Sequence, residues 1–363
     1  MGTVLDSHFL ALTAIVTVLN SLFPHLGDSR ASLCFLCRFW GKIVYKLLLF
    51  IVLCRWDTSC SSSLSQLFSS LIKSPTLQNR SWKLVDWWIM EIDGSTNFII
   101  LAALTLILKG TWYFRQVVLS VLVIIWGIRL GLFLLMRILQ WGEDRRFDEM
   151  RSNLGKLAVF WIFQAVWVWT VSLPLTVVNS SDRDPALDVR DIIGWIMWSI
   201  GTSFEATADQ QKLAFKNSPE NRGKWCNVGL WSYTRHPNYF GEIFLWWGIF
   251  VAASPVLKGA EWLVILGPIF LTLLLLFLSG IPLLEDSADK KFGNVPAYRI
   301  YKRRTSPLIP LPPSLYENLP SWFKTVLLFE LPLYSRSLPT EGLAWCRKSS
   351  EGEGIKGDEM KLS

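Results

Sequence analysis

The sequence has few charged residues. Asp, Glu, Lys and Arg make up 18% of its 363 residues, whereas an ordinary soluble chain carries about 25%. Hydrophobic residues instead reach 51%, and the mean hydropathy is +0.34. This composition excludes a mainly disordered chain, a collagen-like chain and an ordinary soluble domain, and it predicts a polytopic membrane protein.

Cysteine and histidine are also scarce, with six and three residues. Cys34 and Cys37 have the spacing of a redox or metal motif, but the chain has no second such pair and no nearby His to complete a zinc set. We therefore expect no disulfide framework and no metal site. A Gly-x-Gly-x-x-Gly motif after a strand is missing as well, which excludes a Rossmann dinucleotide-binding fold.

The net charge of +7 does not indicate nucleic-acid binding. The 36 Lys and Arg residues are scattered between apolar runs and form no single basic stripe. In membrane proteins such residues crowd the cytosolic loops and set the orientation of the chain. We therefore expect the membrane, and no nucleic acid, as a partner.

Apolar runs of suitable length recur along the chain. They cover residues 8–26, 97–108, 117–136, 157–178, 192–204, 243–257 and 262–284. Within lipid, a helix satisfies its own backbone hydrogen bonds, which an open chain in any other conformation does not. The predicted fold class is therefore all-α, a polytopic transmembrane helix bundle with about six to eight spans.

Composition divides the chain into four parts. Residues 1–26 are predicted to form an N-terminal transmembrane helix, and residues 27–93 an atypical, poorly defined insertion with a Ser-rich patch. Residues 94–313 carry most of the apolar runs and form the membrane-embedded domain. Residues 314–363 contain a short amphipathic segment followed by a tail that we expect to be disordered.

The most informative segment, residues 229–242, contains Arg-His-Pro-Asn-Tyr-Phe-Gly-Glu. Pro237 suits the first turn of a helix, where its missing N–H costs nothing. Arg235 and His236 then lie at the helix N-terminus, where free N–H groups favour an anion, and the guanidinium matches phosphate or carboxylate. A belt of aromatic residues at headgroup depth is the alternative interpretation of this segment.

This segment resembles the C-terminal signature of membrane reductases of the steroid 5α-reductase and sterol C14/C7-reductase type. It is most similar to the DUF1295 branch, in which a Leu-Trp-x-Tyr-x-Arg-His-Pro-Asn-Tyr-x-Gly-Glu string occurs. The resemblance covers residues 94–313 and includes residues 142–151, 205–216 and 292–310. It implies a membrane-embedded, reductase-like domain whose C-terminal helices enclose NADPH and pass a hydride to a carbon–carbon double bond of a steroid-like or enoyl lipid.

The resemblance also implies site residues. The cofactor-binding residues that it implies are Asp209, Lys216, Arg235, His236, Asn238, Tyr298 and Arg304. Reduction of an enone develops negative charge on its oxygen, which a Tyr hydroxyl or a protonated carboxyl stabilises. Tyr239 and Glu242 are therefore the candidate catalytic residues.

Two other functions agree with the same motif. Isoprenylcysteine carboxyl methyltransferases and phospholipid methyltransferases carry a similar Arg-His-Pro-x-Tyr-x-Gly signature, so an S-adenosylmethionine-dependent membrane methyltransferase is the first alternative. A non-catalytic lipid-binding membrane protein is the second. Asn238, Tyr239 and Glu242 together with residues 209–216 favour the reductase. The family resemblance implies the endoplasmic reticulum membrane as the location.

Overall fold

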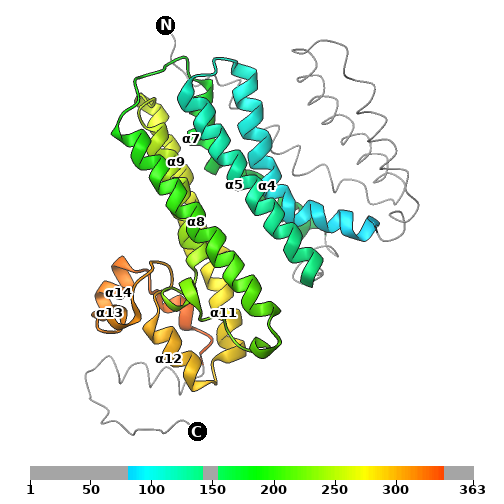
Figure 1. The fold of residues 1–363 in the computed structure, drawn as a ribbon, viewed down its shortest axis with the longest axis vertical. Coiled ribbons are helices and arrows are strands. Elements are labelled where there is room, and N and C mark those ends of the chain that lie inside the picture. The colour runs from blue at the N-terminus through cyan, green and yellow to red at the C-terminus, as the bar shows by residue number, and fades with distance from the viewer. Residues whose placement is uncertain (1–80, 142–153, 339–363) are drawn as a thin grey trace. The chain divides into compact units, whose positions relative to one another are not determined.

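The computed structural model describes residues 81–141 and 154–338 (Figure 1). Within them it gives only the backbone of residues 81–93, 138, 139, 141, 154–158 and 161. Helices predominate in this part of the chain. It contains no β-strand, and one isolated parallel bridge joins Thr234 to Ser306. The all-α prediction is confirmed. The predicted helix over residues 1–26 and the tail after residue 338 lie outside the described residues.

The structure describes ten α-helices. They are α4 (Ser81–Lys109), α5 (Phe114–Trp141), α7 (Leu154–Ser180), α8 (Val189–Asn217), α9 (Pro237–Ala253), α10 (Leu266–Leu273), α11 (Ile281–Phe292), α12 (Pro296–Arg304), α13 (Pro313–Glu317) and α14 (Ser321–Leu327). Between them lie the 3₁₀ turns η4 (Pro219–Asn221), η5 (Gly229–Ser232), η6 (Gly259–Ile265) and η8 (Pro332–Ser335), and the π-helical turn η7 (Leu274–Leu278). Helix α4 crosses the predicted boundary at residue 94.

Three helical stretches are long and apolar enough to cross a membrane. They are Phe114–Arg137, Ile162–Ser180 and Gly259–Phe292. The shorter apolar helix Gly94–Lys109 adds to them. These stretches support the predicted membrane protein, but the predicted count of six to eight spans is not confirmed. Helix α9, for example, has only 17 residues, fewer than the roughly 20 that a typical bilayer requires.

The chain divides into two compact units. The first contains α4 and the stretch Val123–Ser172. Its centre is aromatic, because the ring of Phe98 meets those of Trp126 and Trp167 edge-on, with centroids 5.2 and 5.4 Å apart. The second unit contains Tyr113–Leu122 and the chain from Leu173 onward, and all the site residues predicted from the sequence belong to it.

Helices α8 and α9 lie side by side and antiparallel in the second unit (Figure 1). Glycines spaced seven residues apart, two turns along one face, make this close approach possible. A Cβ on Gly194 would lie 2.5 Å from the carbonyl oxygen of Gly248, and one on Gly201 would lie 2.6 Å from that of Gly241. Since real Cβ atoms do not approach so closely, the packing requires glycine.

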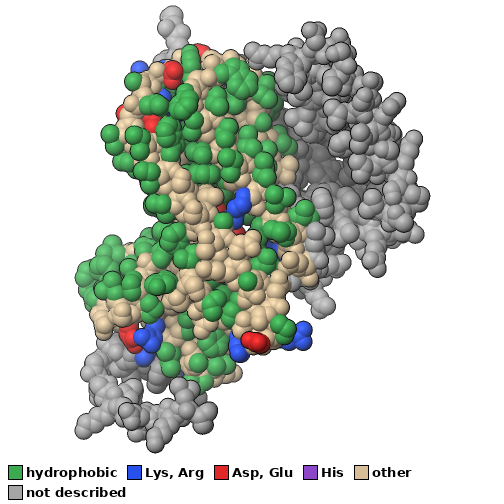
Figure 2. Space-filling view, viewed as in Figure 1, with side chains coloured by type: hydrophobic (Ala, Val, Ile, Leu, Met, Phe, Trp, Pro, Cys, Tyr) green, Lys and Arg blue, Asp and Glu red, His purple; other side chains and the backbone are tan. Residues whose placement is uncertain are grey.

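The opposite face of α8 is apolar and exposed. Ile192, Ile196 and Ile200 recur every fourth residue and are 55%, 52% and 42% exposed. Figure 2 shows hydrophobic side chains gathered over the first half of this helix on the face in view. An exposed apolar row along a helix is typical of a surface that contacts lipid or another protein.

An ion pair holds the start of α8. The guanidinium of Arg115 donates from Nε and Nη2 to the two carboxylate oxygens of Asp191, at 2.6 and 2.9 Å. The same guanidinium donates to the carbonyl oxygens of Pro185 and Ala186. Both side chains of the pair are fully buried. The guanidinium and the carboxylate therefore find their hydrogen-bond partners within the protein.

Candidate functional site

The Arg-His-Pro motif lies at the start of α9, as predicted. Pro237 is the first residue of α9 and His236 occupies the cap position with φ −135° and ψ 62°. The preceding residues are fixed by the chain beyond α12, because the Arg235 N–H donates to the Ser306 carbonyl at 2.9 Å. The Thr234 hydroxyl donates to the same carbonyl at 3.2 Å. These bonds bring the motif close to α11 and α12.

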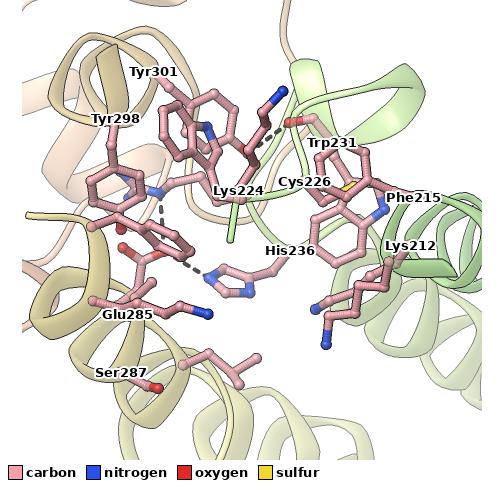
Figure 3. Close-up of a pocket in the computed structure, with 17 residues that line it drawn as sticks. Lys212, Phe215, Lys224, Cys226, Trp231, His236, Glu285, Ser287, Tyr298 and Tyr301 are labelled. Carbon is pink, nitrogen blue, oxygen red and sulfur yellow. Dashed lines mark hydrogen bonds and ion pairs between the residues drawn. The ribbon is translucent and has the colours of Figure 1, made fainter. Parts of the chain in front are cut away.

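A cavity of about 250 Å³ opens where these elements meet (Figure 3). Its walls come from the end of α8, the loop after it, the Arg-His pair, α11 and α12. The lining residues are Lys212, Phe215, Lys216, Lys224, Trp225, Cys226, Trp231, Arg235, His236, Leu284, Glu285, Ser287, Ala288, Lys291, Phe292, Tyr298 and Tyr301. Its composition is therefore aromatic and strongly basic.

Four lysines line this cavity, from α8, the following loop and α11. Lys212 is half-buried, with its ammonium 4.3 Å from the centroid of the Trp231 ring, while Lys216, Lys224 and Lys291 are exposed at the edge. One carboxylate, Glu285, is present among the lining residues. The cavity therefore carries an excess of positive charge, which favours an anionic ligand.

Glu285 is already paired with cations. Its carboxylate lies 3.1 Å from Nε of Arg235 and 2.9 Å from Nζ of Lys302. Lys302 also donates to Asp289 at 2.6 Å, and Arg235 donates to both oxygens of Glu330 at 2.8 Å. Arg235 and Lys302 thus lie among three carboxylates, so these two cations are already compensated, and the positive charge of the cavity comes from the four lysines that line it.

His236 connects this network to the cavity. Its Nε2 lies 2.7 Å from Oε1 of Glu285, whereas its Nδ1 has no hydrogen-bond partner among the described residues. In Figure 3 the ring lies between Glu285 and Lys212. Burial lowers the pKa of His236, and the adjacent carboxylate offsets this only in part. The ring is therefore neutral at pH 7: Nε2–H donates to Glu285, and Nδ1 is left as an acceptor for a ligand.

Aromatic rings form a wall of the cavity. The ring of Trp225 lies 5.4 Å from that of Tyr298 and 5.7 Å from that of Phe292, centroid to centroid. Its buried Nε1–H has no acceptor in the part of the chain that the structure describes. An aromatic surface with an unused donor suits a planar, polar ring of a ligand.

The structure brings four of the predicted site residues to the cavity. Lys216, Arg235, His236 and Tyr298 line it. Arg235 is engaged by two carboxylates, so its charge is not available in the way that the sequence suggested. Tyr298 donates its hydroxyl to Asp289 at 2.9 Å, and burial raises the pKa of this tyrosine.

The other predicted residues do not line the two cavities that we describe in this unit. Tyr239 stacks on His236 with centroids 5.8 Å apart and packs against an apolar cluster. Asn238 and Glu242 follow on α9, and Asp209 is buried on α8. Arg304 pairs with Glu317 at 3.1 Å near the surface.

Several cavity residues were missed by sequence reasoning, including Lys212, Trp225 and Glu285. Signals for two of them were present. Lys212 lies one helical turn before Lys216, so both project from one face of α8. Glu285 ends the uncharged run at residues 262–284, and an ionisable residue at such a place is a candidate for function. Trp225, in a loop, had no comparable signal.

The described residues contain no group of three or more His, Cys, Asp or Glu that could hold a metal ion. Cys34 and Cys37 lie outside the described residues. The cavity donors are ammonium groups and ring nitrogens, which suit a phosphorylated organic ligand better than a cation.

Comparison with known families identifies one match. A family model described as "Protein of unknown function (DUF1295)" matches residues 78–305. The match covers more than half of the chain, so the chain belongs to the DUF1295 family, as the signature predicted. It begins before residue 94 and includes the start of α4. No curated protein and no solved structure matches the chain.

Proposed function

With membership of the DUF1295 family as the premise, we propose that this protein is a membrane oxidoreductase that uses NADPH to reduce a carbon–carbon double bond of a steroid-like or enoyl lipid. The observation that carries the proposal is the set of four lysines around one cavity whose single lining carboxylate is already paired. The resemblance to membrane reductases supplies the reaction type.

Charge separates this proposal from the methyltransferase alternative. NADPH carries three phosphate groups, so a cavity with excess ammonium groups attracts it. S-adenosylmethionine carries no phosphate and has a sulfonium cation, which the same lysines repel. The arrangement of charges therefore supports the dinucleotide over the methyl donor.

The cavity residues fit a phosphorylated nucleotide. Lys212, Lys216, Lys224 and Lys291 would hold phosphate oxygens, and Trp225 would contact a planar ring. The volume of about 250 Å³ falls below the roughly 300–1,000 Å³ of typical ligand sites. It therefore accommodates one phosphorylated part of the dinucleotide and not all of it.

NADPH supplies the hydride when it is bound. The protein must therefore bind the cofactor and the lipid, orient them relative to each other, and supply a proton to the lipid. His236 would accept a hydrogen bond at Nδ1 while Glu285 fixes its ring. Tyr239 and Glu242 lie on the following turns of α9, toward its apolar part, where a lipid would lie. We propose them as the residues that stabilise or protonate the substrate oxygen or carbanion.

Direct binding tests the cofactor assignment. The purified full chain in detergent is titrated with NADPH, NADH and S-adenosylmethionine, and the affinities are measured calorimetrically. We expect NADPH to bind most tightly and S-adenosylmethionine to show no binding. Tight binding of S-adenosylmethionine without NADPH would overturn the proposal in favour of the methyltransferase.

Lipid analysis tests the reaction. Cells that lack the protein should accumulate an unsaturated lipid that disappears when the wild-type gene is restored. A variant with Tyr239→Phe and Glu242→Gln should restore the protein level without removing that lipid. Normal lipids in its absence would instead favour the non-catalytic lipid-binding alternative.

A further inference from the structure

A second basic cavity, of about 200 Å³, lies among α12, α13, α14 and the chain that follows α14. Arg235 is the one residue that lines both cavities. Five cations line the second cavity with one carboxylate, Glu330; the cations are Arg235, Arg299, Lys302, Arg303 and Lys324. Arg235 and Lys302 are compensated by the carboxylates around Glu285, and Arg303 lies beside Glu317. The remaining positive charge belongs to Arg299 and Lys324 and has no role in the proposed reaction.

Two of these cations have no acidic partner. Among the described residues no carboxylate lies within 4.0 Å of Arg299 or Lys324. Arg299 donates from Nε to the Gly293 carbonyl at 2.6 Å, and Lys324 donates to the Glu317 carbonyl at 3.0 Å. Burial lowers the pKa of Lys324, and the carboxylates of Glu330 and Glu317, which form no ion pair with it, offset this only in part.

Helix α14 presents a different face to the outside. Trp322 and Val326 are four residues apart, so they share a face, and they are 64% and 65% exposed. Lys324 lies midway between them in sequence, hence on the opposite face of the helix, where it lines the cavity. A short helix with an exposed Trp beside basic residues is typical of a segment at the membrane interface.

We propose that the second cavity binds the phosphate group of an anionic phospholipid, with Arg299 and Lys324 as the main contacts. The opposite, exposed face of α14 carries Trp322 and Val326 and would hold this helix at the membrane interface. A lipid is favoured over a free phosphate because a helix at the interface brings the cavity to the depth of the lipid headgroups. This site does not depend on the proposed reductase activity, because it shares only Arg235 with the first cavity.

Native mass spectrometry of the full chain in detergent tests this inference. The probes are dioleoyl phosphatidic acid, dioleoyl phosphatidylcholine and inorganic phosphate. We expect the wild-type protein to retain phosphatidic acid at least about tenfold better than phosphatidylcholine, as expected for two charge-assisted contacts. Inorganic phosphate should displace the lipid only at much higher concentration, and excess NADPH should not displace it.

Matched variants separate this cavity from general surface charge. Arg299→Gln with Lys324→Gln should lower retention of phosphatidic acid about tenfold or more. Lys258→Gln with Lys290→Gln removes the same charge from exposed positions outside both cavities and should leave retention unchanged. Trp322→Ala should weaken the lipid without affecting inorganic phosphate.

Several outcomes would overturn the inference. Equal retention of the two lipids, or unchanged retention by the Arg299 and Lys324 variant, would exclude the site. Displacement by equimolar inorganic phosphate would indicate a soluble anion, and displacement by NADPH would make the cavity part of the nucleotide site. The unfolding midpoint of each variant shows whether it folds. If a variant folds poorly, the comparison of the three probes on the wild-type protein still tests the lipid site.

Discussion

The two ends of α8 both use charged side chains, but in different ways. At its start, Asp191 and Arg115 form a buried pair with two hydrogen bonds, and carbonyl oxygens take up further donors of the guanidinium. At its other end, Lys212 and Lys216 line a cavity in which the one carboxylate, Glu285, is already paired with other cations.

At the start of α8 the two charges are of opposite sign and face each other, whereas at its other end charges of like sign line a cavity. A buried pair in which each group has its partner creates little field outside itself, and breaking it is costly because one charge remains buried alone. A set of like charges around a cavity produces an attractive potential for a polyanion and contributes little to the fold. Mutations at the two ends of α8 should therefore change different properties.

The largest expected effect is on stability, at the start of α8, where Arg115 and Asp191 form their buried pair. Arg115→Gln leaves the carboxylate of Asp191 buried without its counter-ion, so we expect a loss of about 3–5 kcal/mol in the free energy of unfolding. Thermal unfolding in detergent measures this. Arg190→Gln removes an exposed arginine that pairs with Asp188 nearby and serves as the control; its unfolding midpoint should match that of the wild-type protein. Equal midpoints for all three proteins would refute the structural role of the pair.

The second-largest effect concerns the close packing of α8 against α9, which lies between the two ends of α8. Gly201→Ala places a Cβ 2.6 Å from the Gly241 carbonyl and forces α8 and α9 apart, at a cost of about 1–3 kcal/mol. Because the start of α9 carries His236, affinity for NADPH should fall together with stability. Ser203→Ala on the exposed face of α8 should change neither quantity. Wild-type stability of the glycine variant would mean that the helices are not in close contact.

Mutations at the C-terminal end of α8, which lines the cavity, should affect ligand binding more than stability. Lys212→Gln with Lys216→Gln should lower the unfolding midpoint much less than Arg115→Gln does, because Lys212 loses its contact with the Trp231 ring but no buried charge loses its counter-ion. The affinity for NADPH should fall about 10- to 100-fold, since two charge-assisted contacts are lost. The salt dependence of binding should also decrease. Calorimetric titration at two ionic strengths measures both. The exposed Lys258→Gln is the control. An unfolded double variant, or one with unchanged affinity, would contradict the contrast between the two ends.

The smallest effect is on pH dependence. Burial lowers the pKa of His236, so the folded protein binds fewer protons at this site than the unfolded chain. Its contribution to stability is then fully present above the unfolded pKa of about 6.5, and it is lost as the pH falls through the lower folded pKa. His236→Gln should flatten the decline in the unfolding midpoint below pH 6.5. Parallel profiles for both proteins would indicate that another group titrates.

Local sequence predicted much of the helical structure. The uncharged runs at residues 157–178 and 192–204 lie inside α7 and α8. Pro237 begins α9 as its ring geometry predicts. The number of spans was harder to predict, because length and apolarity alone do not distinguish a spanning helix from a buried or interfacial one.

The candidate site was predictable in part. Lys216, Arg235, His236 and Tyr298 line the cavity, and each belongs to a segment with a recognisable pattern. Glu285 lies 49 residues from His236 along the chain, so the contact between them depends on how α9 and α11 pack. No local pattern specifies such a pairing.

Composition and local backbone preference are enough to specify that this chain builds apolar helices and that the Arg-His-Pro motif lies at the start of one of them. The pairing of Arg235 with Glu285 and Glu330, and the gathering of four lysines around the cavity, depend instead on the tertiary fold. Electrostatic pairing acts over a few ångströms, and those distances are set by packing between segments that are remote in the chain.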